Sequence, residues 1–351
     1  MDIDTILKTA VANDSSDIHI IAGHPPMVRV HTQMTPLDYP VITPEGALRI
    51  LQHIANEDQL KRFQEHKDSD FSYAVPGLGR FRVNAHMQRG SIGIALRAIK
   101  DKIPPLARLN LPPIIEKLTY LPRGLVLVTG ETGSGKSTTL AAMIQAMNER
   151  YQKHIITLED PVEYAMVSNK CTIEQREVGA DSPSFASGLR HILRQDPDII
   201  LVGEMRDLET TAAAITAAET GHLVLSTLHT NSAASTVDRI IDMYPASQQN
   251  QIRSMLGNTL QAVLSQTLFP RIDQKGMVPA VEIMLATSAI RNLIRENRTF
   301  EIPNVIETNR AMGMQTLDNS IAQLYFNGMI DRADAVGSAV HPEKLERMLA
   351  A

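Results

Sequence analysis

The sequence predicts an α/β protein with a small N-terminal α+β domain and a larger domain built on a mostly parallel sheet. With 351 residues the chain is too long for one ordinary core, so about two domains are expected. From residue 124 onward, strands that are apolar on both faces alternate with helical segments, as in a sheet covered on two sides. A cluster of prolines separates this pattern from the one before it.

Residues 1–100 form the predicted α+β domain. Apolar residues between Ile3 and Val11 recur at helical spacing, which predicts an N-terminal helix. Pro and Gly turns separate the predicted strands, which are "DIHII" (17–21), "MVRVHT" (27–32), "DFSYAV" (70–75) and "RFRVNAHM" (80–87).

Residues 101–123 form a predicted linker, because a proline-rich segment cannot continue as one helix. Its prolines are Pro104, Pro105, Pro112, Pro113 and Pro122.

Residues 124–351 form the predicted second domain. Its strands are "LVLVTG" (125–130), "HIITLED" (154–160), "DIILVGE" (198–204) and "HLVLSTLH" (222–229). Helices are expected up to Arg150, over 185–194 and from Leu208. The remainder from about Ser232 is predicted to be chiefly helical, including one long segment over 246–268.

Composition excludes several classes of protein. Lys and Arg total 34 against 39 Asp and Glu, a net charge of −5, so no surface built to grip nucleic acid is expected. The single cysteine, Cys171, can form neither an intrachain disulfide nor a cysteine-rich zinc site, and we expect a packing residue in a reducing compartment. The acidic start lacks a signal-peptide pattern, and no apolar run approaches the roughly 18 residues of a membrane span. A soluble protein that can dock on a membrane-bound partner is expected.

The segment "LVLVTGETGSGKSTTL" satisfies the phosphate-loop pattern G-x-x-x-x-G-K-[ST], with a strand before it and a helix after it. Backbone N–H groups of such a loop close around phosphate, Lys136 bridges phosphate oxygens and the Ser137 hydroxyl can ligate Mg²⁺. ATP and Mg²⁺ are therefore the predicted cofactors. The predicted binding residues are Gly130, Glu131, Thr132, Gly133, Ser134, Gly135, Lys136, Ser137 and Thr138.

Hydrolysis also needs a group that orients or deprotonates water, and two acidic strand ends compete for this task. Glu204 follows an apolar strand and would face the γ-phosphate at the carboxyl edge of the sheet. The other strand end supplies Glu159, Asp160 and Glu163. A single acid after a strand is more often a helix cap or a solvated residue, but two beside a phosphate loop favour chemistry.

Gly203 occupies a position where many P-loop ATPases carry aspartate. Contact with Mg²⁺, direct or through water, must then come from Ser137 together with Glu163 or Glu204.

Two histidines, His222 and His229, bracket the last predicted strand. His229 lies at the carboxyl end, where ligands bind, and an imidazole there can donate to a γ-phosphate oxygen. We expect His229 to sense the nucleotide rather than act as a general base, although a packed or capping histidine is the simpler alternative.

Taken together, these motifs resemble the type II/IV secretion ATPases. "GETGSGKSTT", "ITLEDPVEY", "DPDIILVGEMRD" and "TAAETGHLVLSTLHTNSA" are similar to that family's Walker A, Asp box, Walker B and His box, and "SDIHI" (16–20) resembles the start of its PAS-like N-terminal domain. The resemblance covers nearly the whole chain. It implies a RecA-like ATPase domain and a homohexamer with ATP at subunit boundaries. The implied catalytic residues are Glu204, Lys136, Glu163 and His229.

The resemblance also implies arginines of the N-terminal domain that act on a neighbouring subunit's ATP. The candidates are Arg80, Arg82, Arg89 and Arg97, of which we predict Arg80, Arg82 and Arg97. Solvated surface charge is the alternative explanation for such a row.

Within the family, the segment "AIRNLIRE" (289–296) resembles a signature of the ATPases that retract type IV pili. The single cysteine also argues against assembly ATPases, which carry a four-cysteine zinc element. The resemblance thus implies a cytoplasmic motor for pilus retraction and twitching motility at the inner-membrane base of the pilus. Implied partners are a PilC-like platform protein and an accessory paralogue. The alternatives are an accessory or bifunctional ATPase, a nucleic-acid motor and a nucleotide switch.

The same segment has a helical pattern. Its apolar stripe is Ala289, Ile290, Leu293 and Ile294, and the rest of its surface is Arg291, Asn292, Arg295 and Glu296. The two arginines are four residues apart, a like-charge spacing that costs an isolated helix a few tenths of a kcal/mol. We therefore expect them to meet an acidic surface on a partner or neighbouring domain. The hypothesis is that this helix serves retraction more than ATP hydrolysis.

Overall fold

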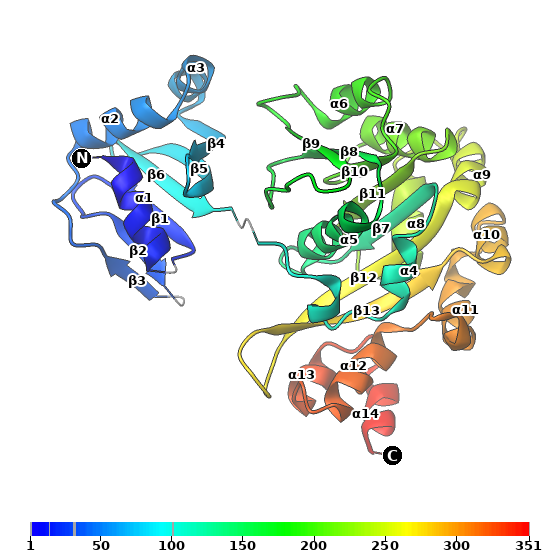
Figure 1. Cartoon of the computed structure of the whole chain (residues 1–351). Helices are drawn as coiled ribbons and strands as arrows, with labels where there is room; N and C mark the ends of the chain where they lie inside the picture. The colour runs from blue at the N-terminus through cyan, green and yellow to red at the C-terminus, as the bar shows by residue number, and fades with distance from the viewer. Residues whose placement is uncertain (1, 14, 31–32, 100–101, 351) are drawn as a thin grey trace. The chain divides into compact units, whose positions relative to one another are not determined.

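The computed structural model describes residues 2–13, 15–30, 33–99 and 102–350 and divides into two compact units (Figure 1). The first unit comprises Met1–Lys102 with Pro161–Ala165, and the second comprises Ile103–Asp160 with Met166–Ala351. Residue 101, where the predicted linker begins, lies outside the described residues. The two units have different sheets, which confirms the predicted combination of an α+β domain with a mostly parallel α/β domain.

Over its described residues, the first unit holds one six-stranded antiparallel sheet in the order β3-β2-β1-β6-β5-β4. Its strands are β1 (Asp17–Ile21), β2 (Met27–Val30), β3 (Gln33–Pro36), β4 (Asp68–Val75), β5 (Gly79–Gln88) and β6 (Ser91–Ala98). This confirms the four strands predicted from the sequence, apart from residues 31 and 32, which lie outside the described residues. The sequence argument missed β3 and β6.

Three helices cover one face of this sheet, namely α1 (Ile3–Ala12), α2 (Pro44–Ile54) and α3 (Glu57–His66). Each starts at a capping side chain: Asp2, Thr43 and Asn56 accept hydrogen bonds from backbone N–H groups of the first turn. The predicted N-terminal helix is therefore confirmed, and its apolar stripe packs on alternate residues of the strands.

The second unit is built on a sheet in the order β13-β12-β7-β11-β10-β8-β9. The strands are β7 (Gly124–Thr129), β8 (His154–Glu159), β9 (Thr172–Glu177), β10 (Ile199–Val202), β11 (Leu223–Leu228), β12 (Leu260–Pro270) and β13 (Met277–Leu285). The pairings are parallel except that between β12 and β13. Parallel pairing gathers the carboxyl ends of β7, β10 and β11 at one edge, where the predicted site residues follow.

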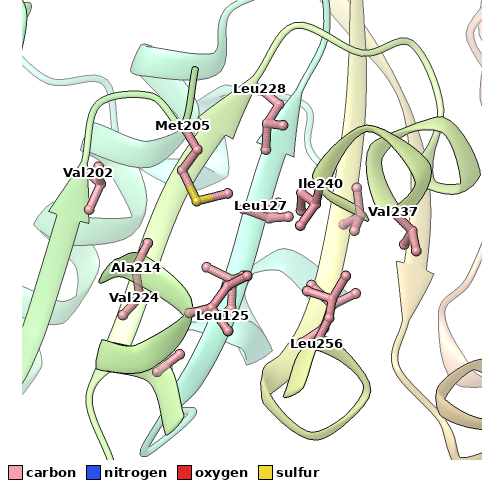
Figure 2. Packing of buried hydrophobic residues seen from close by; sticks show 14 of the residues in the cluster. Leu125, Leu127, Val202, Met205, Ala214, Val224, Leu228, Val237, Ile240 and Leu256 are labelled. Atoms are coloured by element: carbon pink, nitrogen blue, oxygen red, sulfur yellow. The ribbon is translucent and has the colours of Figure 1, made fainter. Parts of the chain in front are cut away.

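Helices cover both faces of this sheet. One face carries α4 (Ile114–Leu118) and α5 (Lys136–Arg150). The other carries α6 (Phe185–Ile192), α7 (Leu208–Glu219), α8 (Ala233–Asp242), α9 (Gln249–Thr259), α10 (Ser288–Arg295) and α11 (Ile302–Thr308). Figure 2 shows how Leu125 and Leu127 of β7 face Ile240 and Leu256 of this second layer.

The C-terminal helices α12 (Leu317–Phe326), α13 (Arg332–Gly337) and α14 (Pro342–Ala350) share a smaller core with the far end of the β12–β13 hairpin. Phe269 of β12 and Val278 of β13 are buried in this core. Within the described ranges, no helix has both the length and the apolar character needed to cross a bilayer.

The predicted long helix over 246–268 is wrong beyond Thr259, where the chain turns from α9 into β12. The strand β12 lies between β7 and β13, and helices cover both faces of the sheet. It is therefore buried on both faces and lacks the alternation that identifies a half-exposed strand. The helix ends at Thr259 with Leu260 as its C-cap, and pairing with β7 and β13 then decides the strand. The strands β9 and β13 were not predicted either.

Cys171 lies in the core beside α5, which confirms the predicted packing role. Its thiol donates to the carbonyl oxygen of Tyr151 at 3.1 Å. Burial raises the pKa of this thiol, so its reactive thiolate form is suppressed.

Candidate functional site

The phosphate loop connects β7 to α5 and depends on glycine at its bends. Gly130, Gly133 and Gly135 have φ angles of +137°, +84° and +89°, a region that favours glycine. A Cβ atom on Gly130 would lie 2.2 Å from the carbonyl oxygen of Gln266. The loop conformation therefore requires glycine at this position for space as well as for backbone angle.

Lys136, the first residue of α5, points its amine back into the loop. The side chain is buried, and Nζ donates to the carbonyl oxygens of Gly130 and Glu131, each at 2.7 Å. Burial lowers the pKa of this amine, and the carboxylates of Glu204 and Glu131 oppose that shift. In the described chain no side chain caps α5, so its first-turn N–H groups stay available to an anion.

The neighbouring strand β12 binds the phosphate loop through side-chain hydrogen bonds. The amide of Gln266 on β12 donates from Nε2 to the carbonyl oxygen of Ser134 and accepts at Oε1 from Thr139 Oγ1, both at 2.9 Å. The hydroxyls of Thr129 and Ser265 are also 2.9 Å apart. Sequence reasoning missed Gln266 and Ser265, because the segment containing them was predicted to be helical and carries no motif.

Glu204 follows β10 and lies beside His229, which follows β11. The Glu204 side chain is 12% exposed, and its Oε2 lies 3.4 Å from His229 Nε2. The same oxygen forms an ion pair with Nε of Arg206 at 2.5 Å. The structure thus brings together two residues predicted from different motifs and adds Arg206, which the sequence argument did not select.

The structure gives a physical reason for glycine at position 203. The backbone N–H of Gly203 donates to Leu158 O, and its carbonyl accepts from Thr227 Oγ1 at 2.6 Å. A Cβ atom there would lie 3.3 Å from both Leu158 O and the Cα of Glu159. The ends of β8 and β10 therefore approach too closely for an aspartate side chain to fit easily.

The acids after β8 differ from one another. Glu159 is buried and accepts from Thr157 Oγ1 at 2.6 Å and from Gln175 Nε2 at 3.2 Å, which ties it to strands β8 and β9. Asp160 and Glu163 are exposed, and Glu163 belongs to the 161–165 segment that groups with the first unit. The catalytic and metal-binding roles of Glu163 remain predictions.

The candidate metal ligands are oxygen atoms. No cluster of three or more His, Cys, Asp or Glu residues suited to a metal occurs among the residues that the structure describes. The exposed Ser137 hydroxyl and the Glu204 carboxylate offer the hard oxygen donors that Mg²⁺ prefers, and such ions commonly keep several waters and bind substrate phosphates. The donor chemistry fits Mg²⁺ held jointly by the protein and a nucleotide.

The two histidines have different surroundings. His222 precedes β11 at the opposite edge of the sheet, where its Nδ1 lies 2.9 Å from Ala217 O and 3.3 Å from Thr220 Oγ1. These contacts fit the structural alternative for His222. Only His229 is at the edge that holds the phosphate loop.

The predicted trans-acting arginines lie on one face of the first unit's sheet. Arg80 and Arg82 occupy alternate positions of β5, and Arg82 pairs with Arg97 of β6. Arg97 donates to Asp17 at 2.7 Å, while Nε of Arg80 is buried and lacks a hydrogen-bond partner within the described ranges. Arg89 lies in the turn between β5 and β6. Their action on a neighbouring subunit remains a prediction.

The segment 289–296 forms most of α10 and packs against α9. Ile290, Leu293 and Ile294 are buried as predicted, whereas Ala289 is exposed. Arg291 Nη1 donates to the carbonyl oxygens of Gly257 and Asn258 at 2.6 and 3.0 Å. Arg295 donates to Asn258 Oδ1 at 2.7 Å.

These contacts give the two arginines partners within the chain, at the negative end of α9. The pair therefore does not require an acidic partner to offset its repulsion, and contact with such a partner remains a prediction. A Cβ atom on Gly257 would lie 3.3 Å from the Arg295 side chain, so glycine lets the two helices approach.

Comparisons with known proteins agree with this arrangement. The profile described as "Type II/IV secretion system protein" matches residues 1–325. The chain is 47% identical to the type IV pilus retraction ATPase PilT of Pseudomonas aeruginosa, over 98% of this chain and 99% of that protein. It is 40% identical to the type IV pilus ATPase PilU of the same organism, over 99% and 91%. A crystal structure of the pilus retraction motor PilT with bound ADP superposes with a TM-score of 0.93 at 44% identity, covering 99% of each chain.

Proposed function

The chain belongs to the type II/IV secretion system protein family and is an ATPase of that family, and from this premise we propose that it powers the retraction of a type IV pilus. The observation that carries the proposal is the similarity to PilT, which spans nearly the full length of both chains. The phosphate loop, Glu204 and His229 supply the chemistry that such a motor needs.

Each site residue has a distinct task in ATP hydrolysis. The loop N–H groups and Lys136 hold the β- and γ-phosphates, and the amine would exchange its two carbonyl partners for phosphate oxygens. Glu204 orients the attacking water and accepts its proton, because it is the acid closest to the sensing histidine. His229 donates to a γ-phosphate oxygen and loses that partner when phosphate leaves. Mg²⁺ at Ser137 and Glu204 would neutralise phosphate charge.

We propose the assembly and location from family membership. A homohexamer at the cytoplasmic base of the pilus would place Arg80, Arg82 and Arg97 of one subunit near the ATP of its neighbour. An arginine supplied in this way offsets charge on the transferring phosphoryl group and links hydrolysis to domain movement. Glu163 is the further acid proposed to act at this boundary. The PilC-like platform protein remains the proposed membrane partner.

A second candidate is a PilU-like accessory or bifunctional role, which the 40% identity to PilU favours. The two roles differ in what happens without the paralogue. A main retraction motor works alone in the cell, whereas an accessory ATPase requires a partner ATPase.

Deletion of the gene in the source cell tests the proposal. We expect hyperpiliated cells without twitching motility, rescued by the native gene but not by a Lys136→Ala variant. Bald cells would show an assembly ATPase instead. Retained motility in the deletion strain, lost only when a paralogue is also deleted, would show the accessory role. Stimulation of the purified ATPase by DNA would favour a nucleic-acid motor.

A further inference from the structure

Glu282 is a buried acid on β13 that the hydrolysis scheme does not use. Glu282 is 8% exposed, and the residues before and after it on β13, Val281 and Ile283, are buried. A charged group in such a place is costly unless hydrogen bonds replace its water. Burial raises the pKa of this carboxyl, with a further contribution from Asp318, and its backbone N–H donors oppose the shift.

Glu282 lies between the first residues of two helices. Oε1 accepts from the backbone N–H of Ala233, which begins α8, at 2.7 Å. On the other side, the backbone N–H of Leu317, which begins α12, lowers the pKa of the carboxyl. The adjacent residues of β13 bond to the same helix start: Val281 N–H donates to Ser320 Oγ at 3.0 Å and Ile283 N–H donates to Gln315 O at 2.9 Å. The capping side chains Ser232 and Thr316 accept from the N–H groups three residues further on, those of Ser235 and Asn319. One carboxylate therefore lies between the N-termini of two helices that are far apart in the sequence.

Each of these helices leads to a segment beside the phosphate loop. The segment that enters α8 carries His229, the neighbour of Glu204, and Asn231. At the other helix, the buried carboxylate of Asp318 accepts from the backbone N–H groups of Val340 and His341 at 2.8 and 3.0 Å.

Both segments line one cavity of about 460 Å³ with the tip of the phosphate loop. Asn231 contributes one wall, residues 338–340 contribute another, and Glu131 to Ser134 contribute the loop. Movement of the histidine segment, when γ-phosphate binds or leaves, would pull on α8 and through Glu282 on α12.

We propose that Glu282 is a positioning residue that transmits the nucleotide state sensed at His229 to the C-terminal helices α12–α14. This inference rests on the proposed ATPase function. A carboxylate suits the task because its two oxygens can accept from N–H donors on both sides. Glutamine has the same shape but one acceptor oxygen, so its NH₂ group would face one of the two helix N–H groups.

The test compares Glu282→Gln with Met284→Ala in the full-length protein. Met284 lies two residues away on the same strand, is fully buried and packs in the core that contains α8, so its truncation weakens packing without changing the Glu282 carboxylate. We expect Glu282→Gln to bind ADP within about twofold of native affinity, while kcat falls about tenfold or more through misplacement of the histidine segment. Met284→Ala, assayed at the same folded fraction, should keep kcat within about twofold.

Hydrogen exchange supplies a readout that a purely structural role would not change. Binding of the non-hydrolysable analogue AMP-PNP should slow amide exchange at residues 338–341 of the native protein, and Glu282→Gln should abolish this slowing. If Glu282→Gln fails to fold, Glu282→Asp, which keeps both acceptor oxygens but shortens the reach, should reduce the slowing.

The results separate the two levels of the proposal. A native protein that neither binds ADP nor hydrolyses ATP would refute the proposed function. A native protein that turns over while Glu282→Gln matches it in kcat, or matches Met284→Ala, would refute only this inference. An undiminished exchange response at 338–341 in the Glu282 variant would refute it as well.

Discussion

The two halves of the second unit's sheet contribute to the candidate site in different ways. The strands β7, β10 and β11 end in groups proposed to touch the nucleotide, namely the phosphate loop, Glu204 and His229. The strands β12 and β13 contribute Ser265, Gln266 and Glu282, which hydrogen-bond to segments that carry those nucleotide-site groups. Residues that contact the nucleotide are restricted in type, so they form a recognisable sequence motif. Residues that only support them can be any side chain with suitable hydrogen bonds, so they form none.

The largest effect should come from the first half. Glu204→Gln keeps the shape of the side chain but removes the carboxylate that orients water, so kcat should fall about 10³-fold or more with ADP affinity largely retained. Glu209→Gln, an exposed acid in the first turn of α7, is the matched control and should turn over at the native rate. Steady-state ATPase assays measure both. More than a tenth of native turnover in Glu204→Gln would refute the assignment.

Substitutions in β12 should have a smaller effect than Glu204→Gln, and this effect should appear in nucleotide binding. Gln266→Ala removes both hydrogen bonds that fasten the phosphate loop to β12 and leaves Ser134 O and Thr139 Oγ1 without them. We expect a loss of about 1–3 kcal/mol in the free energy of unfolding and roughly tenfold weaker ADP binding. Calorimetric titration with ADP measures the second quantity.

Gln261→Ala is the control for this change, because it removes the same kind of side chain from the opposite end of β12. Its ADP affinity should stay native. Equal losses of ADP affinity in both variants would mean that Gln266 acts through general stability and not through the loop.

The fold was predictable wherever one face of an element meets solvent or a motif marks its end. The helix α1 and the strands β1, β4 and β5 show clear spacing, and β7, β8, β10 and β11 are apolar runs between turn residues. The strand β12 is buried on both faces and follows a helix without a proline break, so its sequence fits either structure. Long-range pairing with β7 decides its conformation, and no local pattern records that pairing.

The candidate site divides in the same way. Lys136, Glu204 and His229 are predicted from the sequence because phosphate chemistry favours those residue types in a phosphate loop or at strand ends, and the structure places Glu204 beside His229. Gln266 and Glu282 were not identified, because an amide or an acid within an apolar strand indicates no function by itself. Gly203 was noticed only as a departure, and its cause became visible as the close approach of β8 and β10.

A third prediction concerns the connection from α9 into β12. Arg291 donates to the carbonyl oxygens of Gly257 and Asn258, the last part of α9 before the strand begins, and is half-buried there. Arg291→Ala should lower the free energy of unfolding by about 1–2 kcal/mol, because the helix loses both its hydrogen bonds and a cation at its negative end. Denaturant unfolding measures this loss. If kcat per folded molecule falls more than about threefold, α10 affects the site directly and the two halves are less separate than described.

The smallest effect on stability should come from substitution of Arg295. This variant tests the function of the Arg291–Arg295 pair. Its side chain is exposed, and among the described residues its hydrogen bonds go to side-chain oxygens, those of Asn258 and Asn292, so Arg295→Ala should cost at most about 0.5 kcal/mol. A stability loss equal to that of Arg291→Ala would contradict this ranking.

The informative measurement is twitching motility beside purified ATPase activity. If Arg295→Ala cells lose motility while stability and turnover stay near native, the exposed guanidinium contacts a partner outside the chain in addition to Asn258. If those cells move normally, both arginines serve only to hold α10 on α9, and the exposed residues Ala289, Asn292 and Glu296 become the remaining candidates in segment 289–296 for a role in retraction.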